Sequence, residues 1–591
     1  MCGIAGFIGP WPGALLDQMV ASLRHRGPDG SGRLHDAPSG FGLGHTRLSI
    51  IDLSDAAAQP MHSADGRFVI SYNGEIYNYR ALRRDLIDQG VEFHSESDTE
   101  VILELYRRDG AKAVEALRGM YGFAIWDSRE QGLFLARDPY GIKPLYVADD
   151  GHVLRVASQV KALLAGGGID TSPDPAGHAG YFLFGAVPEP ATLYRGVKAL
   201  PAGHTMWIDA SGLQKTNAFF DIAGELRRGA AEARDIGPLR DGELRDALRD
   251  SVDHHLVADV PVGVFLSAGL DSGTLAALAA ETSSDRLKTL TLGFDEYAGT
   301  ADDEAPLAER IAAQIGADHQ TIRIGGRSFG DQYDAMLAAM DQPSTDGVNT
   351  YFVARAAAGA GLKVALSGLG GDELFGGYSS FADIPRLVGP LAPLRHAPAL
   401  GRALRVVAAP VIKHFTSPKY AGLLEYGSCY GDAYLLRRAL YMPWELPEIL
   451  DPDLARAGWA EIAPRIRIGD DEAASPRARI TALESAWYMR NQLLRDADWA
   501  GMAHSLEIRT PLVDTTLLRR LAGHVAGRHP PSKQDMAATP ATPLSEAVLN
   551  RAKTGFKVPL RKWLAEKSGQ AMGERGIRSW ARVVYRAHWP G

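Results

Sequence analysis

The chain has 591 residues, a formal net charge of −8 and a hydrophobic share of 46%. This length exceeds what one hydrophobic core usually serves and predicts two large domains. The mild negative charge gives no general attraction to nucleic acid, and no apolar run approaches the roughly 18 residues of a membrane-spanning helix. Two cysteines, Cys2 and Cys429, cannot form a disulfide framework, so we expect a reducing, cytoplasmic location.

The first element is the apolar segment of residues 2–9, which begins with Cys2 and has the character of a buried strand. Removal of Met1 would leave Cys2 with a thiol and a free α-amino group. That amine titrates at about pH 8 and can act as the base for the thiol, whose thiolate is a strong nucleophile. An inert cysteine at a frayed terminus is the alternative, but the apolar surroundings favour a nucleophile.

Residues 1–210 have the texture of an α+β domain. Short β-like runs separated by turn residues predict strands, and one helical pattern lies near residues 98–108. The predicted strands include residues 68–72, 122–126 and 132–136. Residues 211–242 follow, and their charged, alanine- and glycine-rich middle predicts a linker between two domains.

Residues 243–565 change to alternating helix and strand. A helical pattern begins near Thr274, and apolar runs predict buried strands at residues 260–266, 289–294 and 363–367. This alternation implies a parallel sheet with its binding site at the carboxyl ends of the strands. From about residue 380 the pattern is mostly helical, and residues 566–591 form a C-terminal tail.

Two loops rich in glycine and serine follow strands of the predicted parallel sheet. The first, Leu266-Ser-Ala-Gly-Leu-Asp-Ser272, turns a strand into a helix whose N-terminus can bind an anion. It lacks the Gly-Lys-Ser/Thr ending of a Walker loop, and Asp271 suits a phosphate site only with Mg²⁺ in between. The second, Ser367-Gly-Leu-Gly-Gly-Asp-Glu-Leu-Phe-Gly-Gly-Tyr378, again presents glycine, serine and acids. Either loop alone is a weak indication, but the pair predicts a nucleotide and metal site.

The strongest sequence signal is a resemblance carried by long motifs. They are Met1-Cys-Gly-Ile-Ala-Gly6, Arg24-His-Arg-Gly-Pro-Asp-Gly30, Tyr72-Asn-Gly-Glu-Ile-Tyr-Asn78, Arg137-Asp-Pro-Tyr-Gly-Ile-Lys-Pro-Leu-Tyr146, Met502-Ala-His-Ser-Leu-Glu-Ile-Arg-Thr-Pro511 and Lys553-Thr-Gly-Phe556. With them the chain resembles glutamine-hydrolysing asparagine synthetases of the bacterial B type, from Cys2 to about Leu564. The resemblance implies a layered αββα N-terminal-nucleophile glutaminase domain over residues 1–210. After the linker it implies an α/β ATP-pyrophosphatase domain, similar to adenine nucleotide alpha hydrolases, over residues 243–565 with a helical C-terminal part.

The resemblance also assigns roles in glutamine hydrolysis. Cys2 would attack the side-chain amide of glutamine, with Asn73 and Gly74 as the oxyanion hole. An arginine would bind the substrate carboxylate through two hydrogen bonds, and two acids would hold its α-amino group. These glutamine-binding residues would be Arg47, Glu75 and Asp98. By residue type alone, Asn73-Gly74 also fits a hairpin turn, Arg47 a surface charge and Asp98 a helix N-cap.

In the second half the resemblance implies ATP and Mg²⁺ as cofactors, with Asp271 and Asp372 as the metal ligands. Lys553 would stabilise charge on the leaving pyrophosphate or during amide formation, although this lysine also fits an exposed salt bridge. Ala268 stands where the family commonly has glycine, and we expect the loop to accommodate its methyl group. The residues implied to bind ATP are Leu266, Ser267, Gly269, Asp271, Ser272, Leu292, Ser367 and Gly368.

One departure from the family concerns the acceptor. Many asparagine synthetases carry a carboxylate at the position of Leu369, and that carboxylate is thought to take a proton from ammonia. A leucine there suggests an apolar neighbour or a changed acceptor, and Glu373 points elsewhere if the loop runs extended. Residues 346–351 also differ from the threonine-rich aspartate-binding stretch of the family.

The expected function is hydrolysis of glutamine at Cys2 and delivery of ammonia to a second site. There a carboxylate, with aspartate as the leading candidate, is adenylated and converted to its amide, with release of AMP and pyrophosphate. Amidation of a sugar acid or a peptide is the alternative. A regulatory or binding module that keeps the fold is a third hypothesis, which intact Asp271, Asp372 and Lys553 disfavour.

Residues 384–424 contain no acidic side chain, although the whole chain is net acidic. Prolines divide this stretch into short helices, and it carries Arg386, Arg395, Arg402, Arg405, Lys413 and Lys419. An insert with solvated or paired arginines is one interpretation. The other is a surface that docks an anionic partner, such as an acidic carrier protein or a membrane. The remaining partners we expect are the small-molecule substrates and a second copy in a homodimer, without nucleic acid.

Overall fold

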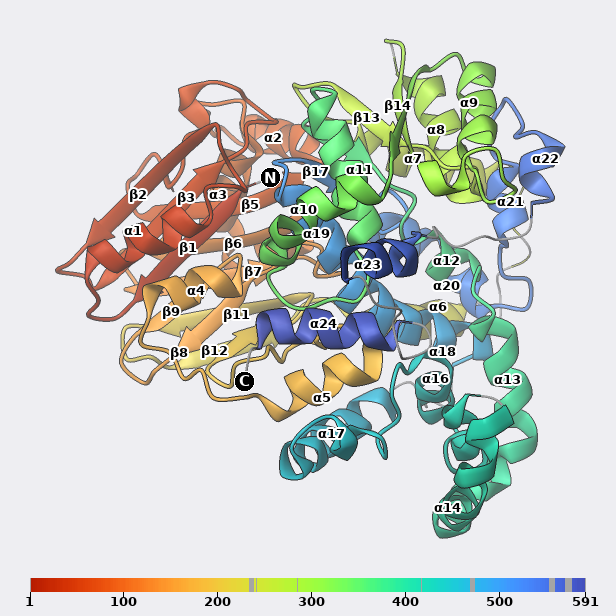
Figure 1. Cartoon of the computed structure of the whole chain (residues 1–591). Helices are drawn as coiled ribbons and strands as arrows, with labels where there is room; N and C mark the ends of the chain where they lie inside the picture. Colours follow the sequence, from red (N-terminus) through yellow and green to blue (C-terminus); the bar gives the residue numbers. More distant parts are fainter. Residues whose placement is uncertain are drawn as a thin grey trace.

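The computed structural model describes residues 2–232, 237, 239–240, 242–283, 285–415, 417–467, 474–551, 558–568 and 577–589. Figure 1 shows two parts in contact with each other. The N-terminal residues form antiparallel sheets, and later residues surround a parallel sheet with helices. The change from antiparallel to parallel pairing follows the change of texture in the sequence.

The N-terminal part contains two six-stranded antiparallel sheets. The first has the order β10-β8-β9-β1-β3-β2, with β1 Gly3–Ile8, β2 Gly30–Asp36, β3 Phe41–Arg47, β8 Tyr146–Asp149, β9 Leu154–Ala157 and β10 Val197–Ala199. The second has the order β12-β11-β7-β6-β5-β4, with β4 Met61–His62, β5 Phe68–Ile76, β6 Gly119–Asp127, β7 Gly132–Arg137, β11 His204–Asp209 and β12 Gln214–Ala218. The strands predicted as β5, β6 and β7 are confirmed, as is the helix α3 (Asp98–Asp109).

The two sheets share one apolar cluster. Leu43 of the first sheet and Trp126 of the second belong to it, and both are almost completely buried. On its other side the first sheet packs against α1 (Gly13–Ser22) and α4 (Val160–Gly166), while α3 contacts β5 of the second sheet. Because β1 and β5 are covered in this way, their residues are buried along the whole strand, and the strand ends near Cys2 lie in the interior.

The predicted linker of residues 211–242 is more ordered than expected. It contains β12, which pairs with β11, and then α6 (Ile222–Glu232). α6 packs against α20 (Thr515–Ala526), and its Gly229 lies so close to Ala522 that a β-carbon would clash. The charged and alanine-rich sequence hides this helix because only a narrow apolar stripe is buried.

The second part is organised around a five-stranded parallel sheet in the order β15-β14-β13-β16-β17. β13 and β16 are neighbours in register, with Val264 opposite Leu366, so their carboxyl ends meet at one edge. The two loops rich in glycine follow these strands and therefore lie side by side. The strands are β13 Val262–Phe265, β14 Lys288–Phe294, β15 Asp318–Ile324, β16 Val364–Leu366 and β17 Glu507–Arg509, and the three that the sequence predicts are confirmed.

Helices make up most of the remaining chain, as predicted from residue 380 onward, although β17 interrupts them. The last one, α24 (Arg578–His588), lies in the predicted tail and packs on α5 (Pro175–Phe184), where the Tyr181 hydroxyl donates to the Ala581 carbonyl (2.8 Å). In the described part of the chain no helix is long and apolar enough to cross a membrane. The other helices are α2 Tyr79–Asp88, α7 Glu243–His255, α8 Leu270–Thr282, α9 Ala305–Gln314, α10 Gly326–Ala339, α11 Val348–Gly359, α12 Gly371–Phe375, α13 Ser380–Leu391, α14 Pro398–Phe415, α15 Leu423–Tyr426, α16 Tyr430–Arg438, α17 Pro452–Ile466, α18 Pro476–Leu483, a π-helix over Glu484–Leu494, α19 Arg495–Met502, α21 Lys533–Ala537, α22 Glu546–Leu549 and α23 Leu560–Ser568.

Buried arginines cross the contact between the two parts. Arg26 donates two hydrogen bonds to Asp498 of α19 (2.7 and 2.9 Å), and the two side chains are 0% and 4% exposed. Arg118 pairs in the same way with Asp514 (2.8 and 3.2 Å). Removing one partner of such a pair leaves the other charge buried without compensation. These pairs therefore hold the two parts in one relative position.

We predict that Asp498→Ala lowers the free energy of unfolding by about 3–5 kcal/mol, because the guanidinium of Arg26 stays buried without its partner. The matched control is Asp17→Ala, since Arg33 and Asp17 also pair at 2.7 Å but are 55% and 48% exposed. That exposed pair should contribute at most about 1 kcal/mol. Denaturant-induced unfolding measures both variants, and equal effects would contradict the role given to burial.

Candidate functional site

Cys2 directly precedes β1 and is only 8% exposed, so it is not a frayed terminus. Its backbone nitrogen, which would become the α-amino group after removal of Met1, donates a hydrogen bond to Oδ1 of Asn73 (2.9 Å). Its carbonyl accepts a hydrogen bond from Nε of Arg26 (2.9 Å), the same arginine that holds Asp498. Burial raises the pKa of the Cys2 thiol, so the thiol depends on a nearby base to ionise at neutral pH.

Asn73 and Gly74 lie inside β5 and not at a hairpin turn. Oδ1 of Asn73 accepts the hydrogen bond from Cys2. Nδ2 of the same side chain is buried and has no hydrogen-bond partner among the described residues. A β-carbon at position 74 would lie 2.2 Å from the carbonyl oxygen of Met120, so the strand pairing requires glycine. A buried, unpaired amide beside a thiol is suited to stabilise an oxyanion.

Strand pairing brings the backbone of Arg47 close to that of Cys2. It ends β3, and the register of β3 with β1 sets it opposite the position of Cys2. Its guanidinium donates to the carbonyl oxygens of Ser54 (2.8 Å) and Asp52, which fixes the direction of the side chain. Arg47 is thus more than a solvated surface charge, because strand register and two hydrogen bonds to backbone carbonyls fix its position.

Asp98 and Glu75 lie next to each other in the interior. Asp98 is not the N-cap of α3, because Ser97 caps that helix, and it accepts hydrogen bonds from the Tyr72 hydroxyl (2.8 Å) and the Ile76 N–H (3.0 Å). Burial raises the pKa of Asp98 to about 6. Burial also raises the pKa of Glu75, with the negative charge of a neighbouring carboxylate adding to the effect. Two buried acids whose pKa values are raised in this way provide a place for a cation such as an ammonium group.

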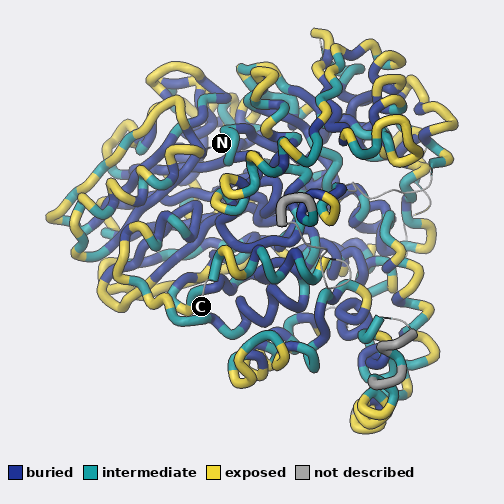
Figure 2. The backbone as a smooth tube through the Cα atoms, in the orientation of Figure 1, coloured by how far each residue is buried: buried dark blue, intermediate teal, exposed yellow. Residues whose placement is uncertain are grey.

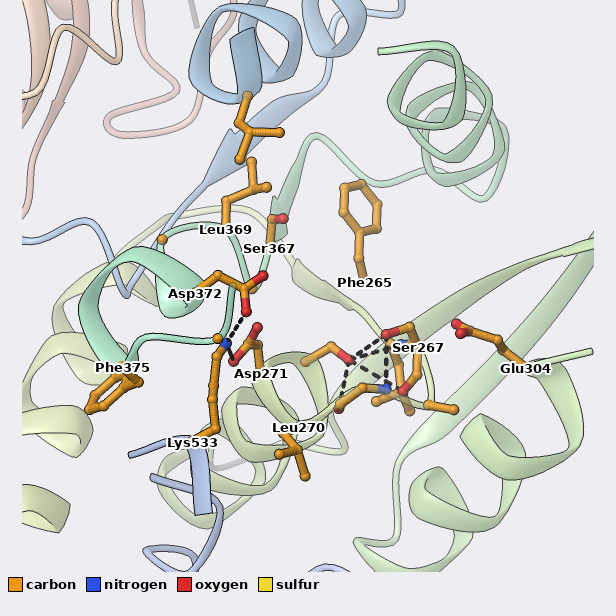
Figure 3. Close-up of a pocket in the computed structure, with 18 of the residues that line it drawn as sticks. Phe265, Ser267, Leu270, Asp271, Glu304, Ser367, Leu369, Asp372, Phe375 and Lys533 are labelled. Carbon is orange, nitrogen blue, oxygen red and sulfur yellow. Dashed lines mark hydrogen bonds and ion pairs between the residues drawn. The ribbon is translucent and has the colours of Figure 1, made fainter. Parts of the chain in front are cut away.

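The second candidate site is a cavity of about 630 Å³ at the carboxyl ends of β13 and β16 (Figure 3). Lys553, predicted to act here, lies outside the described residues. All the other residues predicted to bind ATP or metal line this cavity, namely Leu266, Ser267, Gly269, Asp271, Ser272, Leu292, Ser367, Gly368 and Asp372.

The first loop closes on itself before α8 begins. The hydroxyl oxygens of Ser267 and Ser272 are 2.9 Å apart, and the N–H of Gly269 donates to the Ser267 hydroxyl (3.1 Å). No side chain caps the N-terminus of α8 within the described part of the chain. The first backbone N–H groups of α8 and the positive end of its dipole are therefore available at the cavity, where they suit a phosphate group.

Asp271 and Asp372 converge in the cavity, where the ammonium group of Lys533 contacts both carboxylates (Figure 3). The distance from Nζ of Lys533 to Oδ1 of Asp372 is 3.0 Å. A β-carbon at Gly371 would lie 2.6 Å from Oδ1 of Asp271, and one at Gly377 only 1.9 Å from Oδ1 of Asp372. Burial opposes the charge of Lys533, but the two carboxylates prevail and raise its pKa. The glycines of the second loop are thus what allows two acids and a cation to meet.

This donor set fits Mg²⁺. Proteins commonly bind Mg²⁺ through one or two carboxylates together with substrate phosphates, and Asp271 and Asp372 already converge around a cation. The described residues contain no group of three or more metal-binding side chains. Phosphate oxygens and water would therefore complete the coordination, which suits a metal that enters with its nucleotide.

The side of the cavity around Leu369 is apolar. Leu369 packs against a cluster that includes Leu506 and Ile508, as the sequence suggested for an apolar neighbour. Asn349 and Thr350, at the start of α11, bring the predicted acceptor segment of residues 346–351 to the same cavity.

The position of Glu373 differs from the one expected if the loop ran extended. The chain after Gly370, whose φ is +92°, forms the short helix α12, and Glu373 consequently lines the cavity. It is buried and accepts a hydrogen bond from the Tyr378 hydroxyl (2.9 Å). Burial raises its pKa to about 8.

Sequence reasoning missed Lys533 and Arg509. Lys533 opens α21, which has a capping box formed by Ser532 and Asp535. That spacing of serine and acid is a signal for a helix start. It could have marked Lys533 as a first-turn residue, but not as the neighbour of Asp271, 262 positions away. Arg509 belongs to a recognised motif, yet nothing in the motif shows that it reaches Glu75.

A thiol site and a nucleotide site on one chain define the class of ATP-using, glutamine-dependent amidotransferases. Comparison with known proteins agrees: residues 1–220 match the glutamine amidotransferase domain family, and residues 243–580 match the asparagine synthase family. The chain is 32% identical to the glutamine-hydrolysing asparagine synthetase 1 of Bacillus subtilis, over 96% of this chain and 89% of that protein. It is 35% identical to a protein of Mycobacterium bovis, provisionally named a glutamine-hydrolysing asparagine synthetase, over 95% of this chain and 88% of the relative.

The chain therefore belongs to the family of glutamine-hydrolysing asparagine synthetases. It is an enzyme that takes nitrogen from glutamine and uses ATP to form an amide.

We predict that Asp271→Asn, Asp372→Asn and Lys533→Met each lower ATP-dependent pyrophosphate release by about 100-fold or more, because each removes charge from the phosphate site. Glutaminase activity should stay within about twofold, since the two sites are separate. The matched control is Lys363→Met, because Lys363 also pairs with a carboxylate, Asp29 (2.8 Å), but away from the cavity. Normal pyrophosphate release by any of the three variants would remove that residue from the site.

Proposed function

We propose that the chain converts aspartate to asparagine, with glutamine as the nitrogen donor, ATP as the activating substrate and Mg²⁺ as the cofactor. Glutamine hydrolysis would occur in a layered αββα N-terminal-nucleophile domain, residues 1–210. Amide formation would occur in an ATP-pyrophosphatase domain, residues 243–565, with a helical C-terminal part. The observation that carries the proposal is the unpaired Nδ2 of Asn73 beside Cys2, in a chain whose Asp271 and Asp372 also meet at a second cavity. The proposal includes a cytoplasmic location and a homodimer.

In the first half-reaction Cys2 would attack the side-chain amide carbon of glutamine and form a thioester. The α-amino group of Cys2 would take the thiol proton and pass it to the departing nitrogen, which leaves as ammonia. Nδ2 of Asn73 and the N–H of Gly74 would donate to the oxyanion. Water would then hydrolyse the thioester to glutamate. Arg47, Glu75 and Asp98 would hold the two charged ends of the substrate.

In the second half-reaction the acceptor carboxylate would attack the α-phosphorus of ATP, giving an acyl-adenylate and pyrophosphate. The N-terminus of α8 and the ammonium group of Lys533 would stabilise the negative charge of the phosphates, and Lys553 would act with them. Mg²⁺, when bound by Asp271 and Asp372, would neutralise further phosphate charge. Ammonia would then attack the acyl carbon, and AMP would leave.

The relatives support aspartate as the acceptor. Those that cover nearly the whole chain are named as asparagine synthetases, which favours aspartate over a sugar acid or a peptide. The convergence of Asp271, Asp372 and Lys533 likewise favours an active synthetase over a module that only binds. Leu369 and the apolar wall around it therefore belong to a variant of the acceptor site within this family.

We predict that Cys2→Ala abolishes glutamine-dependent formation of asparagine but leaves formation from ammonium within about twofold, because the second site does not use the thiol. A variant that retains Met1 should behave in the same way, since its amine is blocked. The control is Cys429→Ala, which removes the other thiol of the chain. Amino-acid analysis of reactions with ATP, Mg²⁺ and aspartate measures the product. If Cys2→Ala still used glutamine, or if aspartate gave no amide, the proposed function would be wrong.

A second proposal concerns α14, which projects from the body of the molecule and is largely exposed (Figures 1 and 2). Arg402 on this helix has a side chain that is 73% exposed, and its Nε lies 3.7 Å from Oε1 of Glu425. Arg405 is only 15% exposed, because it pairs with Glu425 and stacks on Trp444, so it belongs to the fold. Apolar side chains also face solvent, namely Leu400 (52% exposed), Leu404 (43%), Val406 (61%) and Val407 (75%). Exposed apolar side chains beside the exposed Arg402 fit the headgroup region of a lipid bilayer, so we propose that α14 docks on an anionic lipid surface.

We predict that the chain cosediments at low salt with vesicles containing phosphatidylserine but not with pure phosphatidylcholine vesicles, and that added salt weakens the binding. The triple variant Leu400→Ser, Arg402→Gln, Val407→Ser should bind at least about tenfold more weakly and keep full activity on free substrates. The control is Arg456→Gln, which removes an arginine of α17 that is 77% exposed. Absence of binding at low salt overturns the proposal. A triple variant that binds vesicles normally overturns it too. The same holds if the triple variant keeps vesicle binding but no longer dimerises or no longer binds an acidic protein.

A further inference from the structure

A strand of the synthetase part reaches into the glutaminase site. β17 is the edge strand of the parallel sheet, and its Arg509 is completely buried. Nη2 of Arg509 lies 3.4 Å from Oε2 of Glu75, which belongs to β5 in the other part of the molecule. The residue that would receive the ammonium group of glutamine thus has its charged neighbour in the synthetase part.

Arg509 is held rigidly by its own part of the chain. Its Nε donates to Oε1 of Glu507 (2.6 Å), and its Nη1 donates to the carbonyl oxygens of His255 (2.8 Å) and Val257 (2.6 Å). These three hydrogen bonds occupy two of the three guanidinium nitrogens, and the third, Nη2, faces Glu75. A guanidinium fixed in this way is preorganised, so little entropy is lost when a further partner binds.

The contact between Arg509 and Glu75 is close but incomplete. Nη2 of Arg509 and Oε2 of Glu75 are both buried, and neither has a hydrogen-bond partner among the described residues. Leaving buried polar atoms unpaired is costly, and such atoms in a native structure usually indicate a place that a ligand or water completes. If the α-ammonium group of glutamine binds at Glu75 as proposed, it would donate to Oε2, the acceptor that lacks a partner among the described residues.

The charge balance of this region also depends on Arg509. Glu75, Asp98 and Glu507 are three buried carboxyl groups, and Arg509 is the guanidinium set among them. Burial raises the pKa of Glu75, the charge of Glu507 raises it further, and the charge of Arg509 opposes both. Without Arg509, Glu75 would hold its proton more firmly and lose the charge that attracts an ammonium group.

The backbone of the same residue serves the other site. The carbonyl oxygen of Arg509 accepts a hydrogen bond from the N–H of Ser367 (2.8 Å), the first residue of the second loop at the nucleotide cavity. β16 and β17 are in register here, with Leu366 opposite Arg509. One residue thus lies between Glu75 and the nucleotide loop, connected to both by direct contacts.

We propose that Arg509 is a positioning residue for glutamine binding, fixing the carboxylate of Glu75 that receives the α-ammonium group of the substrate. The inference rests on the proposed role of Glu75 and extends it, because the glutaminase site is complete only with a strand of the synthetase part. Lysine cannot reproduce this function, since it offers a single charged point in place of the planar fork that Glu507, His255 and Val257 orient.

The test uses the full-length enzyme and the variants Arg509→Lys, Glu75→Gln and the double variant. Arg509→Lys should raise the KM for glutamine about tenfold, while kcat of the glutaminase reaction and of ammonium-dependent synthesis stay within about twofold. Glu75→Gln should raise the same KM, and the double variant should be no worse than the poorer single variant, because both act through one contact. The control is Arg118→Lys, which alters another buried arginine between the two parts, paired with Asp514 (2.8 Å), and should leave the KM for glutamine unchanged.

The outcomes separate this inference from the proposed function. If Glu75→Gln left the KM for glutamine unchanged, the assigned role of Glu75 would fail. If Glu75→Gln raised the KM and Arg509→Lys did not, the inference about Arg509 alone would be overturned. Equal losses of glutamine- and ammonium-dependent activity in Arg509→Lys, with a lowered melting temperature and a normal KM, would show a purely structural role. Additive effects in the double variant would also overturn it.

Discussion

The buried ion pair between Arg26 and Asp498 is the interaction on which the geometry of the whole molecule depends. Arg26 gives two nitrogens to Asp498 of α19 and its third, Nε, to the carbonyl of Cys2. Taking both charges out of water is costly, and the hydrogen bonds offset that cost only while the two parts stay together. The position of the nucleophile is therefore tied to a helix of the synthetase part. α19 is followed along the chain by β17, which carries Arg509 to Glu75, so one short region of sequence contacts the glutaminase site twice.

The cost of burying charge also determines which side chains meet in the nucleotide cavity. Two carboxylates as close as Asp271 and Asp372 would repel each other, and the ammonium group of Lys533 offsets that repulsion. Glycines at positions 371 and 377 let the backbone approach the acids closely, where any β-carbon would clash. Both sites therefore set a cation among acids, Arg509 beside Glu75 and Lys533 between Asp271 and Asp372. In each, the substrates would bring the complementary charges, an ammonium group to one site and phosphates with their metal to the other.

The sequence predicts what depends on neighbouring residues and misses what depends on distant ones. Periodicity over a few residues identifies β5, α3 and the strands of the parallel sheet, and adjacent residues suffice to recognise Cys2 and both loops. Lys533 meets Asp271 across 262 positions, and no local pattern encodes such a contact. α6 stays hidden because its charged residues mask a narrow buried stripe. The loop after β16 bends into α12 at Gly370, a positive-φ turn that a glycine-rich sequence permits but does not specify.

Leu369 is apolar, and so is the cluster against which it packs. A carboxylate at this position would lie against the apolar cluster around Leu506 and Ile508, where an unpaired charge is costly. In the proposed reaction the nucleophile is ammonia, a neutral molecule that an apolar wall does not repel. The side chain at position 369 would then not accept the proton released when the amide forms. In the proposed reaction the leucine would therefore change the route of a proton without changing which bond is made.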